Sequence, residues 1–167
     1  MFDRLVIGVD PGVAATGLAV VAGGSGGAAG VVSAATVRTD PGTPEPERLR
    51  AVFHAVASAI REHHPQAVAV ERLMWGRNVG SAMSVARASG VVLLAAAEAG
   101  ASVFEYAPLE IKLAVTGNGA AGKREVRTAL ERIHGVADLP KDADTVDAVA
   151  VALCHLSQSR ALREAAR

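Results

Sequence analysis

An uninterrupted apolar run opens the hydrophobic pattern of this chain. It covers residues 5–9, is rich in branched side chains, and ends at Asp10, which a Pro-Gly pair follows at once. Such a short run is typical of a strand that is buried on both faces. Because proline disfavours the helical region for the residue before it, we expect Asp10 to stay extended and to close this strand. An Asp before Pro-Gly is also common in simple turns, so Asp10 alone does not define a site.

The rest of the pattern alternates between strand-like and helix-like periods. It predicts further strands at residues 17–22, 31–38, 67–72 and 102–106. It predicts helices near residues 49–60, 80–99, 108–115 and 126–133, and a last helix from residue 142 onward.

The connections between these elements predict the topology. A Gly-rich segment, residues 23–27, joins the second strand to the third, so the first three strands should form an antiparallel meander. A helix precedes the fourth strand, which should therefore lie parallel to the first. We expect one α/β domain over residues 1–167. Its five-stranded mixed sheet would combine the antiparallel meander of three strands with two parallel strands, flanked by helices.

Composition and charge narrow the class of protein. The chain has 167 residues, half of them hydrophobic, which is enough to bury a core. Its formal net charge is zero, so binding to a polyanion would need a local basic patch. Cys154 is the single cysteine, which excludes an intrachain disulfide and is compatible with a reducing cytoplasm. Glycines interrupt the long uncharged stretch of residues 11–37, so we expect no membrane span and a cytoplasmic location.

Two acids are expected side by side at one edge of the sheet. Glu71 ends the predicted fourth strand as Asp10 ends the first. Neighbouring strands are about 4.8 Å apart, so the two carboxylates would face each other. Carboxylates at that distance repel, and a hard cation between them relieves the repulsion.

The start of the last helix offers two more acids. Asp144 and Asp147 are three residues apart and share a helix face. Acids in a first turn are also common as caps and as partners of the helix dipole, and Asp142 or Asp144 would serve in that role. A cap needs only one acid, whereas this turn supplies three before an apolar run. We therefore expect Asp144 and Asp147 to join Asp10 and Glu71.

The chemistry of these four acids indicates a metal. Carboxylates without clustered histidines or a second cysteine are oxygen ligands suited to Mg²⁺ or Mn²⁺. Two such ions about 3.5–4 Å apart can activate a water molecule and hold the leaving oxygen in a displacement at phosphorus. The pattern thus predicts two ions per active site, bound by the four acids.

The motifs together resemble one family, the RuvC-type Holliday-junction resolvases. The resemblance runs from about Leu5 to His155 and keeps the order and spacing of the motifs. The residues that carry it are Asp10-Pro11-Gly12 with Thr16-Gly17, Glu71, Phe104-Glu105-Tyr106 with Pro108 and Lys112, Gly117-Asn118-Gly119 with Ala121 and Lys123, and Ala143-Asp144-Thr145-Val146-Asp147-Ala148.

The resemblance implies an RNase H-like fold, a homodimer, and Mg²⁺- or Mn²⁺-dependent cleavage of four-way junction DNA in recombination and repair. It also implies a branch-migration complex of the RuvA/RuvB type as partner. The acidic tetrad of the family falls on the four acids above, and its basic residues fall on Lys112 and Lys123, with Arg124 beside them. The remaining expected DNA contacts come from the loop after Glu71 and are Met74, Trp75, Arg77 and Asn78.

The sequence departs from the family pattern at several DNA-facing positions. Arg72 replaces the usual Gln after the catalytic Glu, and Ser89 stands where an Arg is common, with Arg87 two residues earlier. The family aromatic in the loop reads Met74, so either Met74 or its neighbour Trp75 would meet the bases. Stacking on an aromatic side chain is worth about 1–3 kcal/mol per base.

Other functions share parts of this pattern. Sugar kinases and actin-like ATPases also place an Asp-Gly turn after a first strand, but they need a second domain, for which 167 residues leave no room. A related RNase H-like nuclease acting on RNA or single strands stays open, because a fold does not specify a substrate. A junction-binding protein without catalysis is a third alternative, against which the four acids argue.

Overall fold

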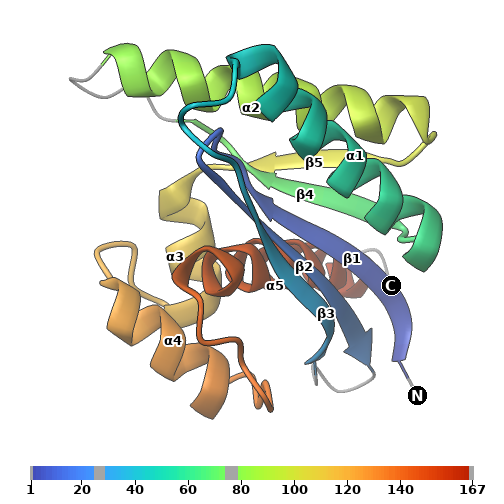
Figure 1. Ribbon diagram of the computed structural model, residues 1–167. Helices are drawn as coiled ribbons and strands as arrows, with labels where there is room; N and C mark the ends of the chain where they lie inside the picture. The colour runs from blue at the N-terminus through green and yellow to red at the C-terminus, as the bar shows by residue number, and fades with distance from the viewer. Residues whose placement is uncertain (1, 25–28, 74–78, 166–167) are drawn as a thin grey trace.

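The computed structural model describes residues 2–24, 29–73 and 79–165 (Figure 1). Its strands are β1 (Phe2–Asp10), β2 (Ala15–Gly24), β3 (Ala29–Arg38), β4 (Ala67–Glu71) and β5 (Val103–Tyr106). Its helices are α1 (Glu45–His63), α2 (Val79–Glu98), α3 (Pro108–Thr116), α4 (Lys123–Arg132) and α5 (Ala143–Ala165).

The sheet has the predicted topology. Its strand order is β3-β2-β1-β4-β5, with β1, β2 and β3 antiparallel and with β4 and β5 parallel to β1. The expected five-stranded mixed sheet is therefore confirmed. β2 and β3 are longer than predicted, because small residues that carry little periodic signal extend β2 at both ends and β3 at its start. Part of the Gly-rich turn, residues 25–28, lies outside the described residues.

Helices cover both faces of the sheet, α1 and α2 on one and α5 with α3 and α4 on the other (Figure 1). Side chains of β1 alternate between these layers, as the period of two in a strand requires. Ile7 and Val9 are fully buried on the α1 side, whereas Val6 is buried on the α5 side. Of the described helices, none is both long enough and apolar enough to cross a membrane.

Helix α5 lies unusually close to the sheet because glycines face it. A β-carbon placed on Gly8 would lie 2.0 Å from the carbonyl oxygen of Ala148, and one on Gly17 would lie 2.0 Å from that of Asp144. No real side chain fits at such distances, so the absence of a β-carbon at both positions allows backbone contact between α5 and the sheet. The helix is in turn buried on nearly all sides, from Thr145 to Leu156.

We predict that Gly8→Ala destabilises the protein strongly. The added methyl group must push α5 away from the sheet, which disrupts the main core and should lower the free energy of unfolding by about 3 kcal/mol or more. Urea unfolding followed by circular dichroism measures this change. Gly122→Ala is the matched control, because the nearest atom to its added carbon is 3.6 Å away. Equal stability of the two variants would contradict the prediction.

Candidate active site

The C-terminal ends of β1 and β4 bring two acids together. Val9 pairs with Val70 in the parallel register, so the next residues, Asp10 and Glu71, end neighbouring strands. By alternation both follow a residue of the α1 side and should therefore point toward α5. Both are partly buried. The arrangement agrees with the expectation that these carboxylates face each other at one edge of the sheet.

The start of α5 lies over the same edge. Asp10 pairs with Gly17 across the β1–β2 ladder, and the carbonyl of Asp144 occupies the space that a side chain of Gly17 would fill. The first turn of α5 is thus held one strand away from Asp10. Asp147 follows one turn later and, like Asp144, is only partly buried, whereas the residues between and after them are buried.

The turn between β1 and β2 is built without any charged group besides Asp10. Thr16 is fully buried, and its hydroxyl donates to the carbonyl of Gly12 at 2.6 Å while it accepts the N–H of Gly12 at 3.3 Å. A β-carbon on Gly12 would lie 2.4 Å from the carbonyl of Ala15. The Asp-Pro-Gly and Thr-Gly motifs therefore form one compact turn that holds the end of β1.

Burial and the neighbouring acids raise the pKa values of Asp10 and Glu71. Burial, followed by the charges of Glu71, Asp147 and Asp144, raises the pKa of Asp10 to about 7, against the opposing charge of Lys123. Burial and then the charge of Asp147 also raise the pKa of Glu71. These shifts mean that the four carboxylates share one electrostatic environment, in which a proton or a cation is favoured.

Two lysines lie among the acids. Lys123, at the start of α4, donates to Asp147 Oδ2 at 2.8 Å, and this hydrogen bond raises the pKa of Lys123. Lys112, in α3, lowers the pKa of Glu71 through its charge. Together with Glu71 and Asp147, both lysines line a cavity of about 230 Å³. The site therefore offers carboxylates and ammonium groups to the same ligand.

Asp142 caps α5, as one of the alternatives for this turn predicts. Its Oδ1 accepts the backbone N–H of Asp144 at 3.0 Å and the hydroxyl of Thr36 at 2.8 Å. Arg38 forms an ion pair with its other oxygen. The hydrogen bond from Thr36 is the largest cause of a pKa of Asp142 below its ordinary value. With the capping role taken by Asp142, Asp144 and Asp147 remain for other chemistry.

The carboxylate oxygens of the four acids are the type of ligand that a hard cation prefers. The four side chains do not, however, converge on one common position. Among the residues that the structure describes, no three Asp, Glu, His or Cys side chains are gathered closely enough to hold a metal ion. Asp147 is turned to Lys123, and Asp144 Oδ2 lies 3.6 Å from Arg38. An oxygen-only donor set with mutual repulsion remains the set that Mg²⁺ or Mn²⁺ prefers.

The predicted DNA contacts are placed only in part. Arg124 is exposed on α4 and lines a hollow of about 530 Å³ with Arg132 and Asn118. Lys112 and Lys123 are in the acid site, as described above. Met74, Trp75, Arg77 and Asn78 lie outside the described residues.

Two of the positions where the sequence departs from the family pattern form ion pairs within the protein, and a third is buried. Arg72 lies 3.8 Å from Glu110, and Arg87 forms an ion pair with Glu45 of α1. Ser89 is buried within α2. These contacts account for the three residues structurally and assign none of them to the acid site.

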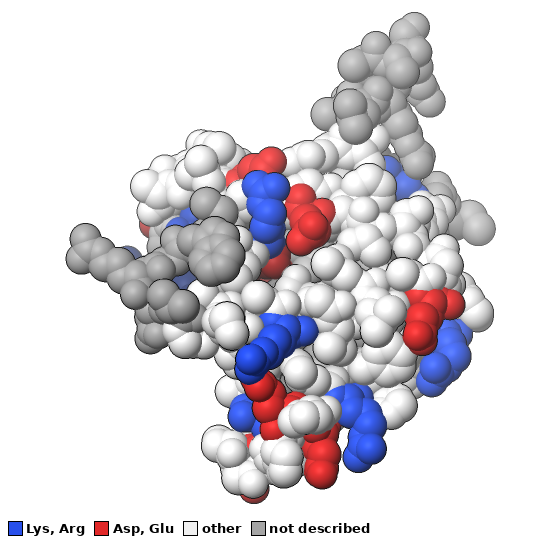
Figure 2. Space-filling view, turned by 90° about the horizontal axis from the view of Figure 1, so that it is seen from above, with Lys and Arg blue, Asp and Glu red and all other residues white. Residues whose placement is uncertain are grey.

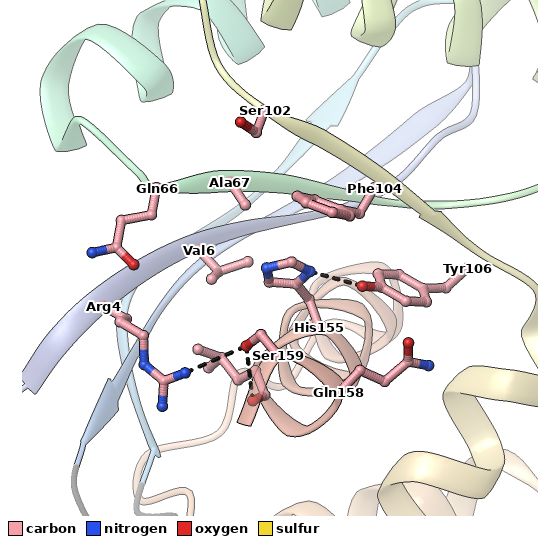
Figure 3. A pocket seen from close by; sticks show the side chains of 11 residues that line it. Arg4, Val6, Gln66, Ala67, Ser102, Phe104, Tyr106, His155, Gln158 and Ser159 are labelled. Atoms are coloured by element: carbon pink, nitrogen blue, oxygen red, sulfur yellow. Dashed lines mark hydrogen bonds between the residues drawn. The ribbon is translucent and has the colours of Figure 1, made fainter. Parts of the chain in front are cut away.

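A third hollow lies between the second half of α5 and the strands β1, β4 and β5 (Figure 3). Its volume is about 440 Å³, and two contacts cross it between α5 and the strands. The Tyr106 hydroxyl and His155 Nδ1 are 2.7 Å apart, and Arg4 donates to Ser159 at 3.3 Å. Phe104 lies against the ring of His155. These contacts tie the second half of α5 to β1 and β5, which explains the tyrosine of the Phe-Glu-Tyr motif.

Sequence reasoning missed the contacts by which side chains of β3 hold the start of α5. Thr36 and Arg38 were predicted only as strand residues, and the pairing of Lys123 with Asp147 was not anticipated. The one available signal was the alternation of Thr36 and Arg38, which places both on one face of a strand. Nothing in the sequence tells which helix that face meets.

Comparison with known proteins agrees with this geometry. The family model described as crossover junction endodeoxyribonuclease RuvC matches residues 6–155. A protein of that name from Desulfitobacterium hafniense is 43% identical over 151 residues, which cover 90% of this chain and 91% of the relative. The one from Pelotomaculum thermopropionicum is 42% identical over 151 residues, 90% of this chain and 92% of the relative.

Solved structures show the same fold. Thermus thermophilus RuvC in complex with a Holliday junction substrate superposes with a TM-score of 0.89 and 36% identity, covering 95% of this chain and 96% of that one. The yeast mitochondrial Holliday junction resolvase Ydc2 superposes with a TM-score of 0.72 at 8% identity, covering 95% and 80% of the two chains, and supports the fold alone.

The sheet order, with acids at the ends of β1 and β4 and at the start of α5, defines an RNase H-like nuclease. Both the family model and the relatives cover most of the chain. The chain belongs to the RuvC family of crossover junction endodeoxyribonucleases.

We predict that Asp10→Asn stabilises the metal-free protein in a pH-dependent way. Because the folded-state pKa of Asp10 is raised from 3.8 to about 7, ionising it costs free energy that the unfolded chain avoids. This cost is absent below about pH 4 and complete above about pH 7. The variant should therefore gain about 2–4 kcal/mol at pH 8 and nothing at pH 4.

Urea unfolding in the presence of a chelator at both pH values measures this gain. Asp138→Asn, at an exposed loop acid, is the control and should show little change at either pH. A gain from Asp10→Asn that is the same at pH 4 and pH 8 would rule out the electrostatic explanation.

Proposed function

We propose that this chain is a structure-specific endonuclease that resolves four-way DNA junctions by paired symmetric nicks, in homologous recombination and repair. It acts as one nuclease domain in the cytoplasm. The observation that carries the proposal is the electrostatic interaction of four acids at one sheet edge, with two lysines beside them, in a chain 36% identical to a RuvC solved with a Holliday junction substrate.

The acids Asp10, Glu71, Asp144 and Asp147 are the residues that would hold two Mg²⁺ or Mn²⁺ ions. Such ions activate a water molecule as nucleophile and stabilise the leaving oxygen of the phosphodiester. The raised pKa values of Asp10 and Glu71 support this role, because both groups favour a positive charge beside them. Hydrolysis leaves a phosphate on one side of the nick and a hydroxyl on the other.

The two lysines are suited to the scissile phosphate. Lys112 and Lys123 line the same cavity as Glu71 and Asp147, so a phosphate bound near the acids meets both ammonium groups. The side chain of Lys123 in its ion pair with Asp147 is 76% exposed. Replacing this ion pair by a contact with a phosphate therefore costs little free energy. Lys123 can thus neutralise Asp147 before DNA binds and contact the phosphate afterwards.

We predict that each of the substitutions Asp10→Asn, Glu71→Gln, Asp144→Asn and Asp147→Asn abolishes cleavage and leaves junction binding measurable. The reason is that these acids serve the reaction, whereas affinity comes mainly from contacts to phosphates. Cleavage of a labelled synthetic junction and gel-shift titration measure the two properties. Near-normal cutting by any one variant would remove that acid from the tetrad.

The same assay separates this function from its alternatives. Matched duplex, RNA–DNA hybrid and single strands serve as competing substrates, and Glu62→Gln, at the far end of α1, is the control variant. Preferred cutting of hybrid or single strands would indicate a related nuclease. Junction binding without cutting in any divalent metal would indicate a binding protein.

A homodimer is the assembly that this function requires. A four-way junction has approximate two-fold symmetry, and a C2 dimer presents two sites in matching relation. The surface that carries α1 and α2 is mostly uncharged, with its basic and acidic groups beside one another (Figure 2). On α2, Met83 and Leu94 are 48% and 53% exposed, and their spacing of eleven residues places them on one helix face. This face is our proposed dimer contact.

We predict that Leu94→Glu shifts the protein to a monomer and uncouples the two nicks. A charge buried in an apolar contact destabilises it by several kcal/mol. Sedimentation velocity, with and without junction DNA, gives the assembly state. Val32→Glu is the control, because Val32 is equally exposed at 52% but lies on β3. A wild-type monomer under both conditions would contradict the dimer.

Two further expectations belong to this proposal. Trp75, or Met74 beside it, would stack on unpaired bases at the junction centre, with Arg77 and Asn78 as polar contacts in the same loop. A branch-migration complex of the RuvA/RuvB type is the proposed partner that delivers the junction.

A further inference from the structure

Two side chains of β3 reach the start of α5. Thr36 and Arg38 are two residues apart in the strand and point to the same face. The Thr36 hydroxyl donates to Asp142 Oδ1 at 2.8 Å, and the Arg38 guanidinium donates to Asp142 Oδ2. Both oxygens of Asp142 are therefore held by β3.

Asp142 in turn holds the first turn of α5. Its Oδ1 accepts the N–H of Asp144 at 3.0 Å. Its carbonyl oxygen accepts the hydroxyl of Thr145 at 2.8 Å and the N–H of Val146 at 3.1 Å. The guanidinium of Arg38 also lies 3.6 Å from Asp144 Oδ2. The position of this turn therefore depends on the position of β3. The same holds for Asp144 in this turn and for Asp147 in the next.

Thr36 lies in register with Asp10 across the three strands of the meander. Across the meander Asp10 pairs with Gly17, and Gly17 pairs with Thr36. The carbonyl of Asp144 lies over Gly17, and Asp142 is bonded to Thr36. Three adjacent strands thus fix the start of α5 relative to the acid on β1.

We propose that Arg38, together with Thr36 and Asp142, positions the acids of α5 for cleavage by anchoring the first turn of that helix to the same row of the sheet as Asp10. The proposal rests on the junction cleavage proposed above. Arg38 acts through Asp142 and Asp144, so it is a positioning residue and not a catalytic one. The ligand geometry at Asp144 and Asp147 depends on it.

The energetics allow this role to be separated from a role in stability. The side chain of Arg38 is 61% exposed and that of Asp142 is 36% exposed. Exposed ion pairs contribute about 0–1 kcal/mol to folding. A displacement of about 1 Å at a catalytic group can nevertheless cost about 100-fold in rate. Loss of Arg38 should therefore slow the reaction far more than it destabilises the protein.

An exposed arginine near an active site can also bind phosphate directly, and the two roles differ in what they change. A direct contact contributes to junction affinity and to its salt dependence. A positioning role leaves affinity alone and lowers the rate of the bound complex. It also couples Arg38 to Asp142, so that substituting both costs no more than substituting one.

The experiment compares the full-length wild-type protein with Arg38→Gln, Asp142→Asn, Thr36→Val and the double variant Arg38→Gln/Asp142→Asn. Arg61→Gln, at an exposed arginine in the last turn of α1, is the control. Single-turnover cleavage at saturating protein gives the rate, and titration of a junction in a chelator gives the dissociation constant. Calorimetry with Mn²⁺ in the absence of DNA tests the acids directly, and thermal melting tests the fold.

We expect Arg38→Gln to cut about 10–100-fold more slowly, with junction affinity within about twofold of wild type and melting within about 2 °C. Mn²⁺ affinity should fall several-fold, and the double variant should be no slower than the slower single variant. Thr36→Val, which keeps both charges, should slow cleavage by a smaller factor.

An unchanged rate for Arg38→Gln would overturn the proposal, and so would weaker junction binding at a normal bound-state rate. Additive losses in the double variant would also overturn it. A wild-type protein that does not cut junctions would instead refute the proposed function, so the two failures are distinguishable.

Discussion

The close contact between α5 and the sheet is the constraint on which the rest of the structure depends. At Gly8 and Gly17 the backbone of the helix occupies space that any other residue would need for its side chain. Small residues of α5, Ala148 and Ala152 among them, meet the sheet there. This contact brings a helix start to within one strand of Asp10, so the core packing and the acid site have the same cause.

The site that results is electrostatically unfavourable in isolation. Burial and repulsion raise the pKa of Asp10 to about 7, and the charge of Lys123 opposes that shift. Asp147 and Asp144 are turned toward Lys123 and Arg38. A group of acids that costs stability persists when function requires it, and a hard cation is the counter-charge that suits oxygen-only ligands.

Separate parts of the interface between α5 and the sheet have different tasks. At the edge that carries the acids, polar groups of β4, α3, α4 and α5 line one cavity. Farther along α5 the polar groups pair with one another, as Tyr106 does with His155 and Arg4 does with Ser159, and hold the second half of the helix in place. The mostly uncharged α1–α2 side is a third surface, and it is the one proposed above for contact with a second copy of the chain. Chemistry, anchoring and assembly thus use separate regions of one sheet-and-helix framework.

The sequence by itself determined the antiparallel meander, the parallel pairing of β4 with β1 and the expected proximity of Asp10 and Glu71, because periodicity and connection length constrain how strands pair. It also determined the family, through motifs that keep their order along nearly the whole chain. Only the tertiary structure decided that Asp142 takes the capping role, that Lys123 pairs with Asp147, and that Thr36 and Arg38 hold the start of α5. The contacts of Lys123 with Asp147 and of β3 with Asp142 join residues 24 to 106 positions apart, and local patterns carry no information on which distant surfaces meet. Gly8 and Gly17 show the same division. The sequence shows that these residues are glycines, but only the fold shows that the backbone of α5 occupies the space where their side chains would be.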